Sequence, residues 1–199
     1  MNPHFIFNAL NTIKGYYSEG SAQEASNYIS KFSKLLRLLL ENVEQYIPLS
    51  LEVEMLTLYV DLVKVRYQYK FDYVIEIGNG IHKEEINIPT LLMQPLIENA
   101  VIHGIAPKSE KGHLIVSFEK HENLLICSVI DDGIGREAAQ KNKRIQHKSK
   151  AVEITRERLK LIQFQENIKC SLEFVDLIDA TGNATGTKVI IIIPIIRNW

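Results

Sequence analysis

The spacing of apolar residues changes near residue 70, and this change limits the folds that the chain can adopt. Before it, apolar residues recur every three or four positions, as on one face of a packed helix. After it come short runs rich in β-branched residues, typical of strands, at 71–77, 114–119, 124–130, 171–175 and 188–193. Helical stretches at 90–103 and 151–164 lie between them. The order predicts an α+β chain: a helical unit, then an α/β sandwich whose mixed sheet is covered by helices on one face.

Residues 1–47 are predicted to form a helical hairpin. Its first helix covers about 3–17, and the second begins near Ser21, which we expect to form a capping box with Glu24. The apolar positions of the second helix make a stripe too wide for one neighbouring helix to cover; they are Ala25, Tyr28, Phe32, Leu35 and Leu39, with Leu36, Leu38 and Leu40. We therefore expect two hairpins to associate as a four-helix bundle, which makes the chain a homodimer.

The second predicted domain, 48–199, begins with a third helix at about 51–68. Pro48 ends the hairpin, and the hydroxyl of Ser50 is expected to cap the new helix. Glu52 and Glu54 stand near its start, where the helix dipole favours negative charge.

Composition and charge narrow the classes of function. The 199 residues are 46% hydrophobic with a net charge of −1, so no global basic field favours direct binding to nucleic acid. No apolar run approaches the ~18 residues of a membrane span, and residues 1–4 do not open a signal peptide. Cys127 and Cys170 are interpreted as core residues of a chain in a reducing cytoplasm. The segment 141–150 is basic without an acid, so it is either a solvated loop or a phosphate contact; its cations are Lys141, Lys143, Arg144, Lys148 and Lys150.

The first motif is Asn-Pro-His-Phe-x-Phe-Asn-x-Leu-Asn at residues 2–11. A lone histidine beside phenylalanine is more often a core residue. His4, however, follows Pro3, where helix hydrogen bonding is incomplete, and an exposed neutral imidazole there is a competent nucleophile. Asn8, four residues later, shares the helix face and can position a water or a phosphoryl group.

The second motif is a mostly apolar helix whose polar residues Glu98, Asn99 and His103 need an explanation. Asn99 and His103 are four residues apart and share a face. An amide oxygen suits Mg²⁺, which takes most of its ligands from phosphate and water. Glu98 is a candidate base or is simply solvated at the edge of a cleft, and Gly104 fits a C′ helix stop.

The third motif, Asp-Asp-Gly-Ile-Gly at 131–135, directly follows an apolar strand. A turn alone would explain it. As a site, Asp131 can accept a hydrogen bond from an adenine amino group, while Gly133 and Gly135 let the backbone approach a nucleotide. The fourth motif, Gly186-Thr187 before the last strand, is weak evidence by itself.

In this order and spacing the four motifs resemble those of the LytS-type sensor histidine kinases of two-component systems. The first looks like that family's phosphoacceptor signature. Gln-Pro-Leu-Ile-Glu-Asn-Ala-x-x-His-Gly looks like its N box, Asp-x-Gly-x-Gly like its G1 box and Gly-Thr-x-Val like its G2 box. The similarity spans residues 2 to about 194. It implies a dimerisation hairpin followed by a Bergerat-type ATP-binding sandwich of the GHKL kind.

The resemblance also implies roles. His4 would accept the γ-phosphoryl group of ATP, Asn99 would ligate Mg²⁺, and Glu98 would assist proton removal. The nucleotide would also lie against His103, Asp131, Gly133, Gly135, Gly186 and Thr187. The segment 141–150 falls where the family has its ATP lid, which favours the phosphate contact.

Partners and location follow from the same resemblance. The phosphoryl group would pass to an aspartate of a response regulator, for this family commonly one with a LytTR DNA-binding domain. Family members carry membrane-spanning sensor segments upstream. We therefore expect this chain to be the cytoplasmic portion of a bacterial inner-membrane sensor, attached to the membrane through segments outside it.

Three departures from the family pattern bear on activity. The G1 box commonly reads Asp-Asn-Gly, whereas Asp132 here is expected to add negative charge near ATP. Ala151 stands where the lid usually has a glycine, and no acidic residue follows His4. The first alternative is therefore a catalytically weak or degenerate kinase that acts as a dimeric scaffold for a regulator. The second, another GHKL ATPase such as a serine kinase or chaperone-type clamp, leaves the setting of His4 unexplained.

Overall fold

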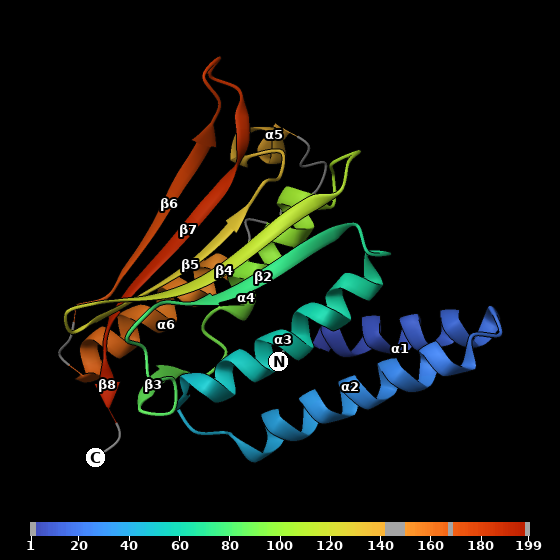
Figure 1. The fold of residues 1–199 in the computed structure, drawn as a ribbon, viewed down its shortest axis with the longest axis horizontal. Coiled ribbons are helices and arrows are strands. Elements are labelled where there is room, and N and C mark those ends of the chain that lie inside the picture. Colours follow the sequence, from blue (N-terminus) through green and yellow to red (C-terminus); the bar gives the residue numbers. More distant parts are fainter. Residues whose placement is uncertain (1–2, 142–149, 167–168, 198–199) are drawn as a thin grey trace.

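The N-terminal hairpin packs on the first helix of the second predicted domain. The computed structural model describes residues 3–141, 150–166 and 169–197. Helices α1 (Pro3–Ser18) and α2 (Ala22–Glu41) form the hairpin, and α2 lies along α3 (Leu49–Arg66) (Figure 1). The predicted apolar seam of α2 is buried at Ala25, Tyr28, Phe32 and Leu35. Ion pairs Lys31–Asp61 and Lys34–Glu54 flank the α2–α3 contact.

Both predicted helix caps are wrong. Ser21 occupies the N-cap position of α2, but its side chain makes no capping hydrogen bond. Helix α3 begins at Leu49, with Pro48 as its N-cap, so Ser50 lies inside the helix. The reason is strand pairing: Pro48 is the last residue of strand β1 (Tyr46–Pro48), which pairs antiparallel with β3 (Ile86–Pro89) and thereby fixes where the chain turns into α3.

The main sheet confirms the predicted α+β class and its five strands. Its order is β2-β4-β5-β7-β6. Strand β2 is parallel to β4 and the other pairs are antiparallel, so the sheet is mixed. The strands are β2 (Phe71–Ile77), β4 (Gly112–His121), β5 (Leu124–Asp131), β6 (Ser171–Ile178) and β7 (Ala184–Pro194). A second, small sheet in the order β1-β3-β8 includes β8 (Ile196–Arg197) and was not predicted.

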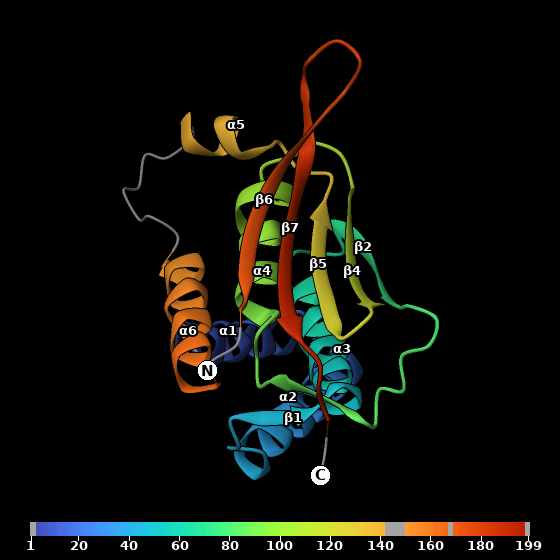
Figure 2. The ribbon, with the colours of Figure 1, turned by 90° about the vertical axis from the view of Figure 1, so that its left-hand side faces the viewer.

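One face of the main sheet is covered by helices, as predicted (Figures 1 and 2). The covering elements are α4 (Gln94–Asn99), the π-helix η1 (Ala100–Ile105) and α6 (Lys150–Glu166). Alternate residues that face them are buried, including Leu114, Val116, Phe118, Leu125, Cys127, Val129 and Ile191. The core interpretation of Cys127 is thus confirmed. Helix α5 (Arg136–Lys141) follows the G1-like turn after β5.

The helix predicted at 90–103 is divided. Residues 90–93 are non-helical, α4 covers six residues, and the remainder is a π-helix. The loop is fixed to the segment that follows α2, because Thr90 Oγ1 donates to the Glu44 carbonyl (2.6 Å) and the Thr90 amide donates to the Gln45 carbonyl (3.1 Å).

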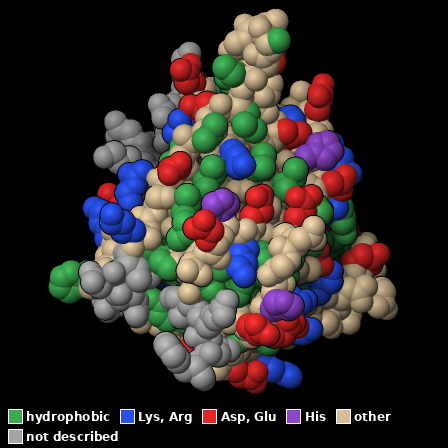
Figure 3. Space-filling view, turned by 60° about the vertical axis from the view of Figure 1, so that its left-hand side comes forward, with side chains coloured by type: hydrophobic (Ala, Val, Ile, Leu, Met, Phe, Trp, Pro, Cys, Tyr) green, Lys and Arg blue, Asp and Glu red, His purple; other side chains and the backbone are tan. Residues whose placement is uncertain are grey.

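The surface carries both signs of charge. On the face seen in Figure 3, acidic and basic side chains are interspersed with apolar ones. Over residues 3–141, 150–166 and 169–197, no helix combines the length and the apolar character needed to cross a membrane.

Candidate functional site

A cavity of about 360 Å³ lies between α4, η1 and α6 on one side and the ends of β5 and β7 on the other. Five of the predicted site residues line it: Asn99, His103, Asp131, Gly135 and Thr187. Residues as far as 88 positions apart along the chain therefore meet here, as the combination of motifs predicted. Helix α6 contributes Val152, Glu153 and Arg156 to the lining.

Asp131 is a buried carboxyl at this cavity. Only 3% of its surface is exposed, and its Oδ1 accepts a hydrogen bond from the Gly133 amide at 3.0 Å. Burial raises the pKa of Asp131 to about 7, although the Gly133 amide and Lys108 act in the opposite direction. Thr187 lies directly opposite it in the β5–β7 pair. A buried carboxyl with few partners of its own is suited to bind a polar ligand edge.

Glycines let the backbone close around Asp131. A Cβ on Gly186, whose φ is +149°, would lie 1.9 Å from the Asp131 carbonyl oxygen, and a Cβ on Gly133 would lie 2.4 Å from Gly104 Cα. The predicted C′ role of Gly104 is wrong, because η1 continues to Ile105. Gly104 is needed for space instead: its Cβ would lie 2.4 Å from Asp131 Oδ1.

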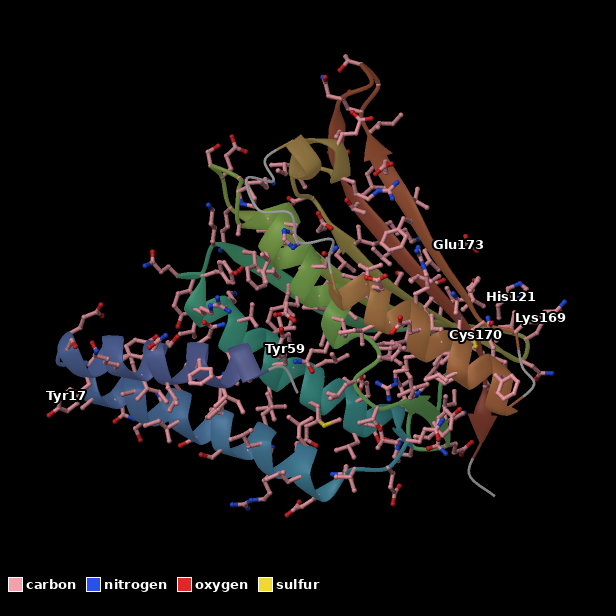
Figure 4. The ribbon with its side chains drawn as sticks, turned by 180° about the vertical axis from the view of Figure 1, so that it is seen from behind. Tyr17, Tyr59, His121, Lys169, Cys170 and Glu173 are labelled. Atoms are coloured by element: carbon pink, nitrogen blue, oxygen red, sulfur yellow. The ribbon has the colours of Figure 1, made fainter. Side chains whose placement is uncertain are left out.

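The adjacent residues Glu98 and Asn99 face different surroundings. Asn99 lines the cavity, whereas Glu98 lies near the hydroxyls of Tyr59 and Tyr67 on the α3 side. Burial is the main cause of the raised pKa of both tyrosines, and the charge of Glu98 adds to it. Phe5, in the first turn of α1, packs its ring on the ring of Tyr59. Tyr59 is labelled in Figure 4. Glu98 therefore lies near Tyr59, the residue that the start of α1 contacts.

Part of the predicted site lies outside the described residues. The backbone of His4 belongs to α1, but its side chain is outside them. Asn8 is half-buried on α1 one turn later. The described residues also exclude three cations of the basic segment, Lys143, Arg144 and Lys148. They include the backbone but not the side chains of Lys141, Lys150 and Ala151.

Asp132 is not among the residues that line the cavity. Its carboxylate accepts hydrogen bonds from the His113 amide (2.7 Å) and pairs with Lys108 Nζ (3.1 Å). Partial burial opposes ionisation, but these partners outweigh it and lower the pKa of Asp132. The negative charge of Asp132 is therefore compensated by Lys108.

Sequence reasoning missed Arg136 and Phe174, which also line the cavity. Arg136 Nε and Nη2 each donate to the Asp176 carboxylate at 2.6 Å, and the guanidinium lies 5.5 Å from the Phe174 ring centroid. This pairing fixes the start of α5 to β6. The position of Arg136 directly after the G1-like turn was the one available signal.

The fold is that of a histidine kinase catalytic region. The histidine kinase domain of the Erythrobacter litoralis EL346 blue-light activated histidine kinase superposes with a TM-score of 0.53 at 15% identity, covering 96% of this chain and 95% of that one. The mycobacterial sensor histidine kinase MprB superposes with a TM-score of 0.53 at 10% identity, covering 78% of this chain and all of that one (100%).

Sequence comparison adds the family. Residues 1–71 match the family model described as histidine kinase. The sensor histidine kinase YpdA of Escherichia coli K12 is 34% identical over 138 residues, which are 68% of this chain and 23% of YpdA. The sensor protein LytS of Bacillus subtilis is 32% identical over 136 residues, 68% of this chain and 22% of LytS. The chain belongs to the LytS-type sensor histidine kinases, and it spans about 23% of the length of the curated relatives it matches.

Proposed function

We propose that this chain binds Mg·ATP in the cavity and phosphorylates itself on His4, as the cytoplasmic catalytic portion of a two-component sensor. The observation that carries the proposal is the meeting of Asn99 and the buried Asp131 in one cavity, in a chain whose α1 opens with the phosphoacceptor motif. Residues 1–47 are then the dimerisation and phosphoacceptor segment, and 48–199 the ATP-binding domain.

The adenine end of the cavity is assigned to the strands. Ionised Asp131 accepts a hydrogen bond from the exocyclic amine of adenine, with Thr187 beside it in the neighbouring strand. Gly133, Gly135 and Gly186 leave room for the backbone to approach the base. A volume of about 360 Å³ lies within the range of small-molecule sites, about 300–1,000 Å³.

The phosphate end is assigned to the helices. The amide oxygen of Asn99 is a hard ligand suited to Mg²⁺, and His103, one turn later, can donate to phosphate. Bound Mg·ATP supplies the phosphoryl group and partly neutralises its charge. Glu98 is assigned the proton that the imidazole of His4 loses, and this is supported by its position near Tyr59, on which the start of α1 packs. Asn8 is assigned to orient that end of the helix.

We propose two partners, a second copy of the chain and a response regulator. The regulator carries the aspartate that accepts the phosphoryl group and commonly a LytTR domain. Support for the homodimer comes from large apolar side chains that stay exposed on the hairpin, among them Phe7 (65%), Leu10 (53%) and Leu40 (76%). Membrane attachment is assigned to segments outside this chain, and no direct contact with nucleic acid is proposed.

The test is acid-labile ³²P incorporation from labelled ATP, with His4→Gln as control. We expect label in the wild type, none in His4→Gln, and nearly equal ATP affinity for both. Acid-stable label would favour a serine kinase. Nucleotide binding without any label would favour the regulator scaffold.

A further inference from the structure

Glu52 is a fully buried carboxyl that the proposed reaction does not use. It lies in the first turn of α3 with no exposed surface, and its Oε2 accepts a hydrogen bond from the Leu91 amide at 2.9 Å. Its other oxygen, Oε1, is buried without a hydrogen-bond partner among the residues that the structure describes. A buried carboxyl is costly to keep unless its surroundings stabilise it, so the groups around it are informative.

The loop that Glu52 holds leads directly into the N box. Leu91 has a left-handed backbone (φ +58°), which is unfavourable for a residue with a side chain, and the bond to Glu52 keeps its amide satisfied. Leu92 and Met93, which follow, are almost completely buried, and their amides also stabilise the charged carboxylate. A displaced loop would therefore move the start of α4, and with it Asn99.

A charged residue of α6 also influences Glu52. Arg158 lies close enough for its charge to favour ionised Glu52, although the two side chains form no hydrogen bond or close ion pair among the described residues. Cys127 of β5 is the other titratable side chain in electrostatic contact with Glu52 among the described residues. Its thiol is neutral because burial raises its pKa. Tyr46 lies near Arg158.

We propose that Glu52 is a positioning residue: through its hydrogen bond to the Leu91 amide it fixes the loop before α4, and so sets where Asn99 lies relative to the α6 wall of the cavity. The proposal rests on the proposed nucleotide function. The affected ligand atoms are the phosphates and their Mg²⁺, because adenine is assigned to Asp131 on the strands.

The experiment measures binding of adenosine and of Mg·ATP by calorimetry and takes the ratio of the two affinities. The variants are Glu52→Gln, Arg158→Met and the double variant, with Glu54→Gln as control. Glu54 lies in the same helix, but its carboxylate pairs with Lys34 at the surface. We expect Glu52→Gln to lower the Mg·ATP-to-adenosine ratio about tenfold with adenosine affinity nearly unchanged. The double variant should lower the Mg·ATP-to-adenosine ratio no further than Glu52→Gln does, because the effect of Arg158 on the loop acts through the Glu52 carboxylate.

The pH dependence of the same ratio separates positioning from a purely structural role. Burial raises the pKa of Glu52 to about 7, so in the wild type the ratio should fall as pH is lowered through about 7. In Arg158→Met, which leaves the Leu91 bond in place, the fall should begin at a higher pH. Titration of Asp131 affects adenosine and Mg·ATP alike, so it cancels in the ratio. The profiles are compared in a His103→Gln background, because His103 is assigned to the phosphates alone.

Three results would overturn the proposal. One is a loss of adenosine and Mg·ATP affinity in equal proportion in Glu52→Gln. The second is a wild-type ratio that is flat with pH, and the third is an unaltered profile in Arg158→Met. The second and third results come from the wild type and Arg158→Met, so they test the proposal even if Glu52→Gln does not fold. A wild type that binds neither ligand would instead refute the nucleotide function itself.

Discussion

The ring of Phe5 lies on the ring of Tyr59, with centroids 5.1 Å apart and planes tilted by 34°. Both side chains are buried. Phe5 directly follows the candidate phosphoacceptor, and the hydroxyl of Tyr59 interacts with Gln94 and lies near Glu98. This contact joins the start of α1 to the N-box helix of the same chain.

The first prediction concerns this contact. Phe5→Leu should slow phosphorylation of His4 by about tenfold or more at saturating Mg·ATP, because transfer depends on placement of the nucleophile. Mg·ATP affinity should change less than twofold. The control is Tyr17→Leu at the far end of the hairpin, where 85% of the side chain is exposed (Figure 4). Equal slowing in both variants would mean that the ring contact has no special part in placing His4.

The second prediction concerns Asn99. Asn99→Ala should remove most of the Mg²⁺-dependent part of ATP affinity, because it deletes an amide ligand at the cavity. Calorimetric titrations with Mg²⁺ and with EDTA measure this difference. Asn27→Ala, an exposed amide on α2, is the matched control and should behave as wild type. If Mg·ATP affinity is unchanged in Asn99→Ala, the residue is structural.

The third prediction concerns Asp131 and pH. Because the ionised carboxylate is the better acceptor, wild-type ATP affinity should rise between about pH 6 and 8, following the raised pKa of about 7. Asp131→Asn should weaken ATP by about 1–3 kcal/mol, the value of a hydrogen bond to a charged group. Its profile should be flat, and pyrophosphate binding should hardly change. Equal losses for pyrophosphate and ATP would contradict the adenine assignment.

The same shift predicts a stability effect with a definite sign. The native pKa of Asp131 lies above its unfolded value, about 3.9, so the native state holds the proton more tightly between these values. Its contribution to stability is therefore present at low pH and is lost as pH rises through about 7. Thermal unfolding from about pH 5 to 8 should show a smaller decline in Asp131→Asn than in the wild type.

The fourth prediction concerns Gly186. Gly186→Ala places a Cβ 1.9 Å from the Asp131 carbonyl oxygen, which is backbone and cannot move aside without opening the β5–β7 pair. We expect a loss of at least about 3 kcal/mol in unfolding free energy and of ATP binding. Gly15→Ala, in open space on helix α1, should stabilise by about 0.5–1 kcal/mol. A well-folded Gly186→Ala variant that binds ATP normally would show that the close backbone packing around Asp131 does not require glycine at position 186.

Much of the fold could be predicted because it depends on local patterns. Strand β2 has the predicted bounds, Phe71–Ile77, because its run of β-branched and aromatic residues is itself the signal for a strand. The five cavity-lining residues could be predicted because each belongs to a short motif. The small sheet could not be predicted, because β8 has only two residues and is a strand only through its pairing with β3, far away in the chain. The π-helix, the burial of Glu52 and the Arg136–Asp176 pair likewise depend on contacts between distant segments.

The short strand β1 has a mechanical consequence. The connection between helix α2 and the second predicted domain is held in place, because β1 is already paired with β3 when the chain enters α3. The two hydrogen bonds of Thr90 fasten the same connection to the loop before α4. A displacement of the end of α2 would therefore be transmitted through Thr90 to the loop before α4, the helix that carries Asn99 into the wall of the cavity.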